Sequence, residues 1–150
     1  MENQTEIQKQ IKALFASQSL AMLATQNLDQ PYASLVAFAN ADDLRQIFFV
    51  TPKTTRKFAN LTATPNVALL INSALNQVED FHRAIAVTAV GKAEEITGNE
   101  RDRTLPIYLA KHPHLEEFAM SPTCALVRVT VKSYYLVQTF QNVTEFHFKQ

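Results

Sequence analysis

The chain has 150 residues, of which 47% are hydrophobic and 19% charged, a composition that predicts one folded domain with a substantial core. Its 14 basic and 14 acidic residues cancel, which argues against a general nucleic-acid-binding surface. No apolar run is long enough to span a membrane, the first ten residues are too polar for a signal peptide, and the single Cys124 cannot form an internal disulfide. We therefore expect a cytoplasmic protein that does not enter a membrane.

The first predicted element is an amphipathic helix over residues 5–16. Its apolar residues recur at helical spacing: Ile7, Ile11, Leu14 and Phe15. Thr5 and Gln8 have the form of a capping box, in which the two ends of the motif satisfy each other's backbone groups. We expect this helix to pack on the outside of a sheet.

Three strands are predicted next, over residues 19–25, 32–40 and 45–50. Polar turns separate them, and these turns are too short to carry a crossover connection. The three strands should therefore form an antiparallel meander.

The turn after the third strand holds most of the polar chemistry of this region. A helix is expected to begin near Thr54 and to end before Pro65. Its start gathers the hydroxyls of Thr51, Thr54 and Thr55 with the cations Arg56 and Lys57. Unpaired N–H groups and the helix dipole attract anions, and Arg binds phosphate oxygens as a fork, so the turn suggests a phosphate site.

The simpler interpretation of this turn is a capped surface helix whose cations only face water. Cations in a first helical turn slightly oppose the dipole, which makes them poorly placed for stability alone. A glycine-rich phosphate loop is excluded, because the two glycines, Gly91 and Gly98, lie elsewhere.

The rest of the chain alternates strands and helices. Residues 66–72 predict a strand buried on both faces, and a polar loop follows at 73–82. Residues 84–96 predict a long strand in which Gly91 indicates a bulge or bend. Residues 97–120 should form two or three short helices divided by Pro106 and Pro113.

Two further strands are expected near the end of the sequence, at 124–139 and 144–148. In the first, Val127, Val129 and Val131 should share one face. The pattern predicts an α+β fold in a single domain covering residues 1–150: a mostly antiparallel β-barrel of six or seven strands with short flanking helices.

Several of these segments, in this order, resemble the pyridoxamine-phosphate-oxidase-like family of FMN-binding split β-barrels. The resemblance rests on ASLVAF, a strand ending in Thr51, TPKTTRK, a short helix ending in a Pro-Asn pair, VALLI and VGKAEEI. It covers residues 20–96, with a looser match over 124–140. Each motif alone is weak, but the order and spacing are specific.

The resemblance implies a homodimer with FMN at the subunit interface. By position, the phosphate would be held by Thr51, Thr55, Arg56 and Lys57. The flavin ring would lie along the second strand, against the backbone of Ser34, Leu35 and Val36, and Val50 would contribute mainly main chain.

Three departures from the family bear on substrate. Ser34 stands where pyridoxamine-phosphate oxidases usually have an Arg, and no residue among Ala84, Ile85 and Ala86 matches their Gln from the partner subunit. Their Arg- and Trp-rich C-terminal segment has no counterpart, since the chain has no Trp and ends at Gln150. We therefore expect cofactor binding without oxidation of pyridoxamine phosphate.

The other polar candidates have simpler explanations. His112 and His114 flank a proline without nearby carboxylates and are expected at the surface, so no metal site is predicted. Glu94 and Glu95 should point to opposite faces of a strand and cannot act as an acid–base pair. Cys124 has apolar neighbours and is expected in the core.

Three functional hypotheses remain open. The first is an FMN-dependent oxidoreductase acting on an unknown small molecule, with no catalytic side chain assigned because the flavin itself carries the electrons. The second is a flavin-binding or sensing protein without turnover. The third keeps the fold and replaces FMN by a deazaflavin or by haem, and haem would require an axial His at the pocket.

Overall fold

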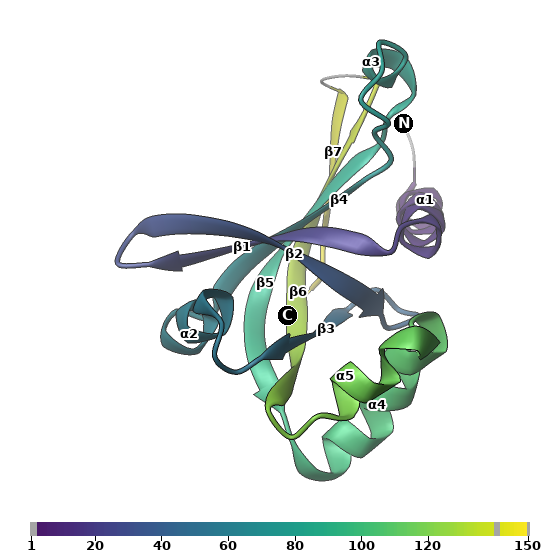
Figure 1. Cartoon of the computed structure of the whole chain (residues 1–150). Coiled ribbons are helices and arrows are strands. Elements are labelled where there is room, and N and C mark those ends of the chain that lie inside the picture. The colour runs from purple at the N-terminus through teal and green to yellow at the C-terminus, as the bar shows by residue number, and fades with distance from the viewer. Residues whose placement is uncertain (1–2, 140–141, 150) are drawn as a thin grey trace.

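The computed structural model describes residues 3–139 and 142–149 and shows a closed antiparallel β-barrel of six strands with one extra strand (Figure 1). The strand order is β3-β2-β1-β4-β5-β6-β7, and β3 also pairs with β6, which closes the barrel. The strands are β1 Leu20–Asn27, β2 Gln30–Asn40, β3 Gln46–Pro52, β4 Asn66–Asn72, β5 Ala86–Ile96, β6 Cys124–Gln138 and β7 Asn142–His147. The predicted α+β barrel and its antiparallel meander are confirmed.

Strand β6 closes the barrel with only its first half. Along one side it pairs with β5 over nearly its whole length. On the other side, Cys124–Thr130 pairs with β3, whereas Ser133–Gln138 pairs with β7. The end of β7 and the start of β3 therefore meet beside the middle of β6.

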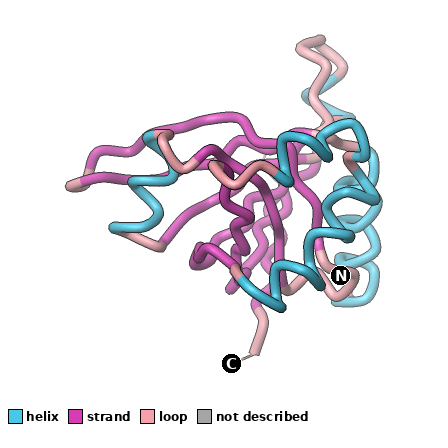
Figure 2. The backbone as a smooth tube through the Cα atoms, turned by 60° about the horizontal axis from the view of Figure 1, so that its bottom comes forward, coloured by secondary structure: helices cyan, strands magenta, loops and turns pink. Residues whose placement is uncertain are grey.

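Short helices flank the barrel, and Figure 2 shows their distribution around the strands. They are α1 Gln4–Ser17, α2 Arg56–Ala63, α3 Asp80–Arg83, α4 Gly98–Lys111, the 3-10 turn Pro113–Leu115 and α5 Glu116–Met120. No helix in the described ranges is long and apolar enough to cross a membrane.

Two separate cores hold the molecule together. The larger one fills the barrel, and α1 and α2 contribute Phe15 and Leu61 to it. Because Phe15 packs edge-on against the rings of Phe38 and Tyr134, α1 covers the interior at this point, and the expected position outside the sheet is wrong. The smaller core lies outside the barrel, beneath α4 and α5.

Helix starts differ from the predictions by one or two residues. Asn3, not Thr5, caps α1, and its side-chain oxygen accepts a hydrogen bond from the backbone N–H of Glu6 at 2.9 Å. Thr55, not Thr54, caps α2, and its hydroxyl accepts from the N–H of Phe58 at 3.3 Å. In both cases neighbouring residues are equally good caps, so the sequence alone leaves the choice to the surrounding packing.

Two further expectations are wrong. Pro106 does not divide the helical region, because α4 continues through it and buries Leu105 and Tyr108 on either side. Strand β4 is not buried on both faces: Val67, Leu69 and Ile71 are in the core, while the residues between them are partly exposed. The expected bulge is confirmed, since the β5–β6 register shifts between Val90 and Gly91. Phe140, the expected end of the family resemblance, lies outside the described residues.

Candidate functional site

Strands β2 and β3 diverge where the sequence predicts the cofactor. We refer to the region between β2 on one side and β3 with the start of α2 on the other as the gap. The two strands pair only over Phe38–Asn40 and then diverge. Within the part of the chain that the structure describes, residues 30–37 of β2 pair with β1 on one edge and with no strand on the other. Unpaired strand edges offer backbone donors and acceptors to a ligand.

The turn between β3 and α2 lies at this gap and is built by two threonines. The hydroxyls of Thr51 and Thr55 are 2.9 Å apart, and the Thr55 hydroxyl also donates to the carbonyl of Pro52 at 3.0 Å. Thr51 is fully buried, whereas Thr54 is exposed. These hydrogen bonds fix the turn and set the direction in which α2 starts.

The first turn of α2 presents two N–H groups and two cations. Thr55 caps the N–H of Phe58, but the N–H groups of Arg56 and Lys57 find no acceptor among the described residues. The Arg56 guanidinium lies over the ring of Tyr32 on β2, 5.7 Å from its centre, so this side chain reaches back across the gap. Neither Arg56 nor Lys57 forms an ion pair with a described residue.

The predicted residues of β2 have three different surroundings. Leu35 points outward and is 61% exposed, while Val36 is buried in the barrel. The Ser34 hydroxyl is shielded from solvent and has no hydrogen-bond partner in the described structure. A buried hydroxyl without a partner costs free energy, which a ligand that hydrogen-bonds to it would recover.

Structure therefore brings some of the predicted residues together and separates others. Thr51, Thr55, Arg56 and Lys57 form one polar cluster at the start of α2. The side chain of Val50 packs in the smaller core beneath α4, so only its main chain is available to a ligand at the gap.

The remaining candidates are resolved by their contacts. His112 was expected at the surface, but it is 2% exposed and its Nε2 lies 2.7 Å from the carbonyl oxygen of Phe38. Among the described residues no group of three or more His, Cys, Asp or Glu side chains could hold a metal. Glu94 pairs with Arg128 and Glu95 with Lys53, so the two carboxylates have separate partners. Cys124 is buried, as predicted.

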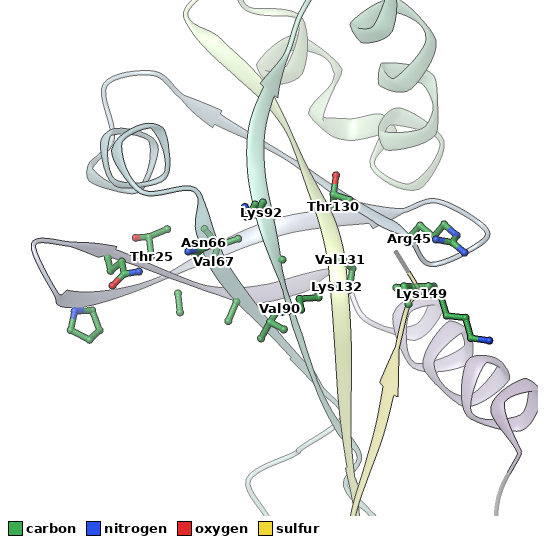
Figure 3. A pocket seen from close by; sticks show the side chains of 16 residues that line it. Thr25, Arg45, Asn66, Val67, Val90, Lys92, Thr130, Val131, Lys132 and Lys149 are labelled. Atoms are coloured by element: carbon green, nitrogen blue, oxygen red, sulfur yellow. The ribbon is translucent and has the colours of Figure 1, made fainter.

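A pocket of about 810 Å³ that was not predicted from the sequence lies on the outer face of the sheet (Figure 3). None of the eight residues predicted to bind the cofactor lines it. Four cations do: Arg45, Lys92, Lys132 and Lys149. Lys92 and Lys132 lie on β5 and β6, Arg45 lies in the turn before β3 and Lys149 follows β7, so no local motif connects them. The one signal in the sequence was Gly91, which marks the bulge at this pocket.

Known structures share this fold. A haem-binding protein from Mycobacterium smegmatis matches with a TM-score of 0.81 at 17% identity, over 98% of this chain and 59% of that one. ChuZ from Campylobacter jejuni matches with 0.81 at 14% identity, over 98% and 61%. A FAD-binding protein from Mesorhizobium loti matches with 0.68 at 13% identity, over 85% and 90%. The chain thus spans about three fifths of the first two structures.

Sequence comparison gives the family directly. No curated protein sequence matches the chain. The family model described as pyridoxamine 5'-phosphate oxidase, however, matches residues 7–138, which include all six strands of the barrel but not the extra strand β7. With the barrel, the divergence of β2 from β3 and the Thr-Thr-Arg-Lys turn in place, the chain is a member of the pyridoxamine 5'-phosphate oxidase family.

Proposed function

We propose that this protein binds FMN in the gap between β2 and α2 and serves as a flavin-dependent oxidoreductase for a small molecule. One observation carries the proposal. The gap combines an unpaired strand edge, a buried Ser34 hydroxyl without a partner, and a helix start with two free N–H groups and two unpaired cations. These groups fit the two ends of a flavin mononucleotide.

The phosphate end would lie at the start of α2. The free N–H groups of Arg56 and Lys57 and the helix dipole favour an anion there, and the guanidinium adds a forked donor. The ring of Tyr32 contacts the Arg56 guanidinium through a cation–π interaction, which limits the orientations that the Arg56 side chain adopts. Thr51 and Thr55 hold the turn in shape.

The ring end would lie along β2. The free edge at Ser34, Leu35 and Val36 offers backbone groups to the polar side of a flat ring, and the Ser34 hydroxyl offers one more hydrogen bond. When bound, FMN supplies the electron-accepting chemistry. The chain would orient the ring and exclude water from it. Hydride transfer to a flavin needs no protein acid or base.

We further propose that the protein is a homodimer, with each cofactor site next to the interface. Leu20, Met22 and Leu35 are 54%, 44% and 61% exposed on the outside of the barrel. Met22 lies between Leu35 and Leu70 in the register of β2, β1 and β4, so these apolar side chains form one continuous row. A contiguous apolar surface of this kind marks an interface. Leu35 would then belong to both the interface and the cofactor site.

The comparisons support a cofactor-binding role without selecting the cofactor, because one similar structure is a FAD-binding protein and another a haem-binding protein. The visible absorption spectrum of the purified protein separates these outcomes. A flavin spectrum, with FMN identified by mass after heat release, is expected. A Soret band would contradict the proposal and favour haem.

Binding at the turn is tested by comparing FMN with riboflavin, which lacks the phosphate. We expect the protein to bind FMN at least about tenfold more tightly, because charge-assisted hydrogen bonds are each strong enough for such a factor. Arg56→Gln with Lys57→Gln should remove this preference. Lys9→Gln with Lys12→Gln removes the same charge from exposed positions on α1 and should preserve it. An unchanged preference in the Arg56/Lys57 variant would place the phosphate elsewhere.

Turnover needs a separate experiment. The FMN-loaded protein should oxidise NADH or NADPH in the presence of a suitable member of a panel of electron acceptors. Stable FMN binding without oxidation of either nicotinamide would support a flavin-binding protein without turnover instead.

A further inference from the structure

The cationic pocket on the outer face of the sheet has the size of a ligand site. Its volume of about 810 Å³ falls within the range of about 300–1,000 Å³ that is usual for small-molecule sites. It lies next to the apolar row of Leu35, Met22 and Leu70: one cross-strand row further along, β1 and β4 place Ala24 and Ala68 in its floor.

Positive charge is concentrated in this pocket. Arg45, Lys92, Lys132 and Lys149 line it, and no acidic residue in the described part of the chain does. None of the four forms an ion pair with any residue in the ranges 3–139 and 142–149. The whole chain has no net charge, so this excess is local. Like charges gathered without counter-charges repel one another, and a bound anion relieves that repulsion.

The bulge between β5 and β6 brings Lys132 into this cluster. In the register, Val90 faces Ser133 and Gly91 faces Val131, so Lys132 has no partner residue on β5. A bulge of this kind redirects a side chain and is a stable feature of a fold. Lys132 is thereby placed in the pocket beside Lys92, the residue after Gly91 on the neighbouring strand.

Gly91 is what permits this arrangement. A Cβ atom at this position would lie 2.1 Å from the backbone oxygen of Thr130, far inside the contact distance. Any other residue would force β6 away from β5. The bulge at Lys132 therefore depends on the close backbone approach that Gly91 allows.

The two ends of the pocket differ in chemistry. Figure 3 shows Lys92 and Lys132 near its middle, Arg45 and Lys149 together at one end, and Thr25 and Asn66 at the other. Arg45 is held by the ring of Phe148, whose centre lies 4.8 Å from the guanidinium carbon. Between the ends, Ala24, Ala68 and Val90 give a floor of small apolar side chains. The floor suits a flat apolar body, and the cations suit an acidic group attached to it.

We propose that this pocket binds a small aromatic anion, a flat molecule that carries a carboxylate, sulfonate or phosphate group, at a site distinct from the turn at α2. Lys92 and Lys132 provide the central charge, and Arg45 adds a forked donor at one end. This site does not depend on flavin binding, because it shares no residue with the gap between β2 and α2.

The test uses two dyes with the same aromatic body. 8-Anilinonaphthalene-1-sulfonate carries a negative charge, whereas N-phenyl-1-naphthylamine does not. Fluorescence titration of the wild-type protein should give one anionic dye per chain, bound about tenfold or more tightly than the neutral one. Because this comparison needs no variant, it holds even if a substitution disturbs folding.

Variants then locate the site. Lys92→Gln with Lys132→Gln keeps most of each side chain but removes both charges, and should abolish the preference for the anionic dye. Lys9→Gln with Lys12→Gln and Arg56→Gln with Lys57→Gln each remove two positive charges elsewhere, and both should preserve it. Saturating FMN should also leave the anionic dye bound.

Four results would overturn the proposal. Equal affinity for the two dyes would show that the cations do not contribute. A preference that survives in the Lys92/Lys132 variant would place the anion elsewhere. Displacement of the dye by FMN would merge this site with the flavin site. A change in sedimentation of the Lys92/Lys132 variant would mean that a second copy of the chain, and not a small ligand, occupies the pocket.

Discussion

Strand β2 passes through two different surroundings on the outside of the barrel. Near its end, Ala39 packs beneath α4 together with Phe48 and Val50 of β3, and all three are buried. Leu35 lies four residues earlier on the same face of the strand. It is 61% exposed and forms a row with Met22 of the neighbouring strand. We refer to these regions as the covered surface and the bare surface.

An apolar side chain on the outer face of a strand does not by itself reveal what covers it. On the covered surface the partner is part of the same chain: Tyr108 of α4 donates a hydrogen bond to the carbonyl of Ala37 at 3.2 Å. At the end of the same helix, Lys111 donates to the carbonyl of Phe15 on α1 at 2.8 Å. On the bare surface the described chain supplies no such helix. Apolar area exposed on a strand is costly in water, so the bare surface is where we expect a second copy to bind.

The largest effect should come from the covered surface. Phe48→Ala removes a ring that is 1% exposed between the barrel and α4. We expect a loss of about 3–5 kcal/mol in the free energy of unfolding, measured by urea titration, because the cavity adds to the lost burial. A loss below about 1 kcal/mol would show that α4 and α5 are not tightly packed on the barrel.

A pH-dependent effect is expected from Lys111, which fixes the end of α4. Burial lowers its pKa from 10.5 to about 8. Between these values the unfolded chain holds a proton that the folded chain has released, so the free energy of unfolding should increase with pH across this window.

The measurement compares urea titrations of the wild-type protein and Lys111→Met at about pH 7.5 and about pH 9.5. The wild-type protein should gain stability relative to the variant at the higher pH. An identical pH dependence in the two proteins would mean that Lys111 keeps its proton in the fold, held by the Phe15 carbonyl and by the Phe38 ring 3.8 Å away.

The smallest effect on folding, and the clearest on assembly, is expected from the bare surface. Leu35→Asp should change the free energy of unfolding of the isolated protomer by no more than about 0.5 kcal/mol, since the side chain is already exposed. Sedimentation should nevertheless fall from a dimer of twice 16.9 kDa to a monomer. Leu28→Asp, at the tip of the β1–β2 hairpin, is the matched control and should remain dimeric. A monomeric wild-type protein would refute the interface.

The strands and their order along the chain could be predicted from the sequence, but what covers their outer faces could not. Alternation placed Val127, Val129 and Val131 on one side of β6, and the structure puts all three in the barrel core. The same reasoning failed for β4, because an unbroken apolar run looks identical whether its outer side meets a helix, a second subunit or water. What covers the outer face of a strand depends on the whole fold and cannot be inferred from the residues of that strand alone.

Site prediction was limited in a similar way. The threonines and cations of the turn at α2 are adjacent in sequence, so their shared location follows from a local pattern, although their contacts with FMN stay a prediction. The cationic pocket combines residues as distant as Arg45 and Lys149, which only the closed barrel brings together. Pro106 does not end α4 as predicted, because the packing of Leu105 and Tyr108 outweighs one lost backbone hydrogen bond.

The bulge residue Lys132, which has no partner on β5, changes which residues of β6 face the barrel interior. Up to Val131 the odd-numbered residues face the barrel interior, but beyond the bulge it is the even-numbered Tyr134 and Leu136 that do so. One extra residue has switched the parity of the strand. A regular strand of the same sequence, without the bulge, would exchange the inner and outer faces of everything after Val131, turning Tyr134 toward solvent and taking its hydroxyl away from the carbonyl of Leu44, 2.6 Å from it. A deletion of Lys132 would instead make Ser133 follow Val131 directly, and Tyr134 would keep its inward orientation. The bulge is thus the point at which the inward-facing positions of β6 change from odd to even residue numbers.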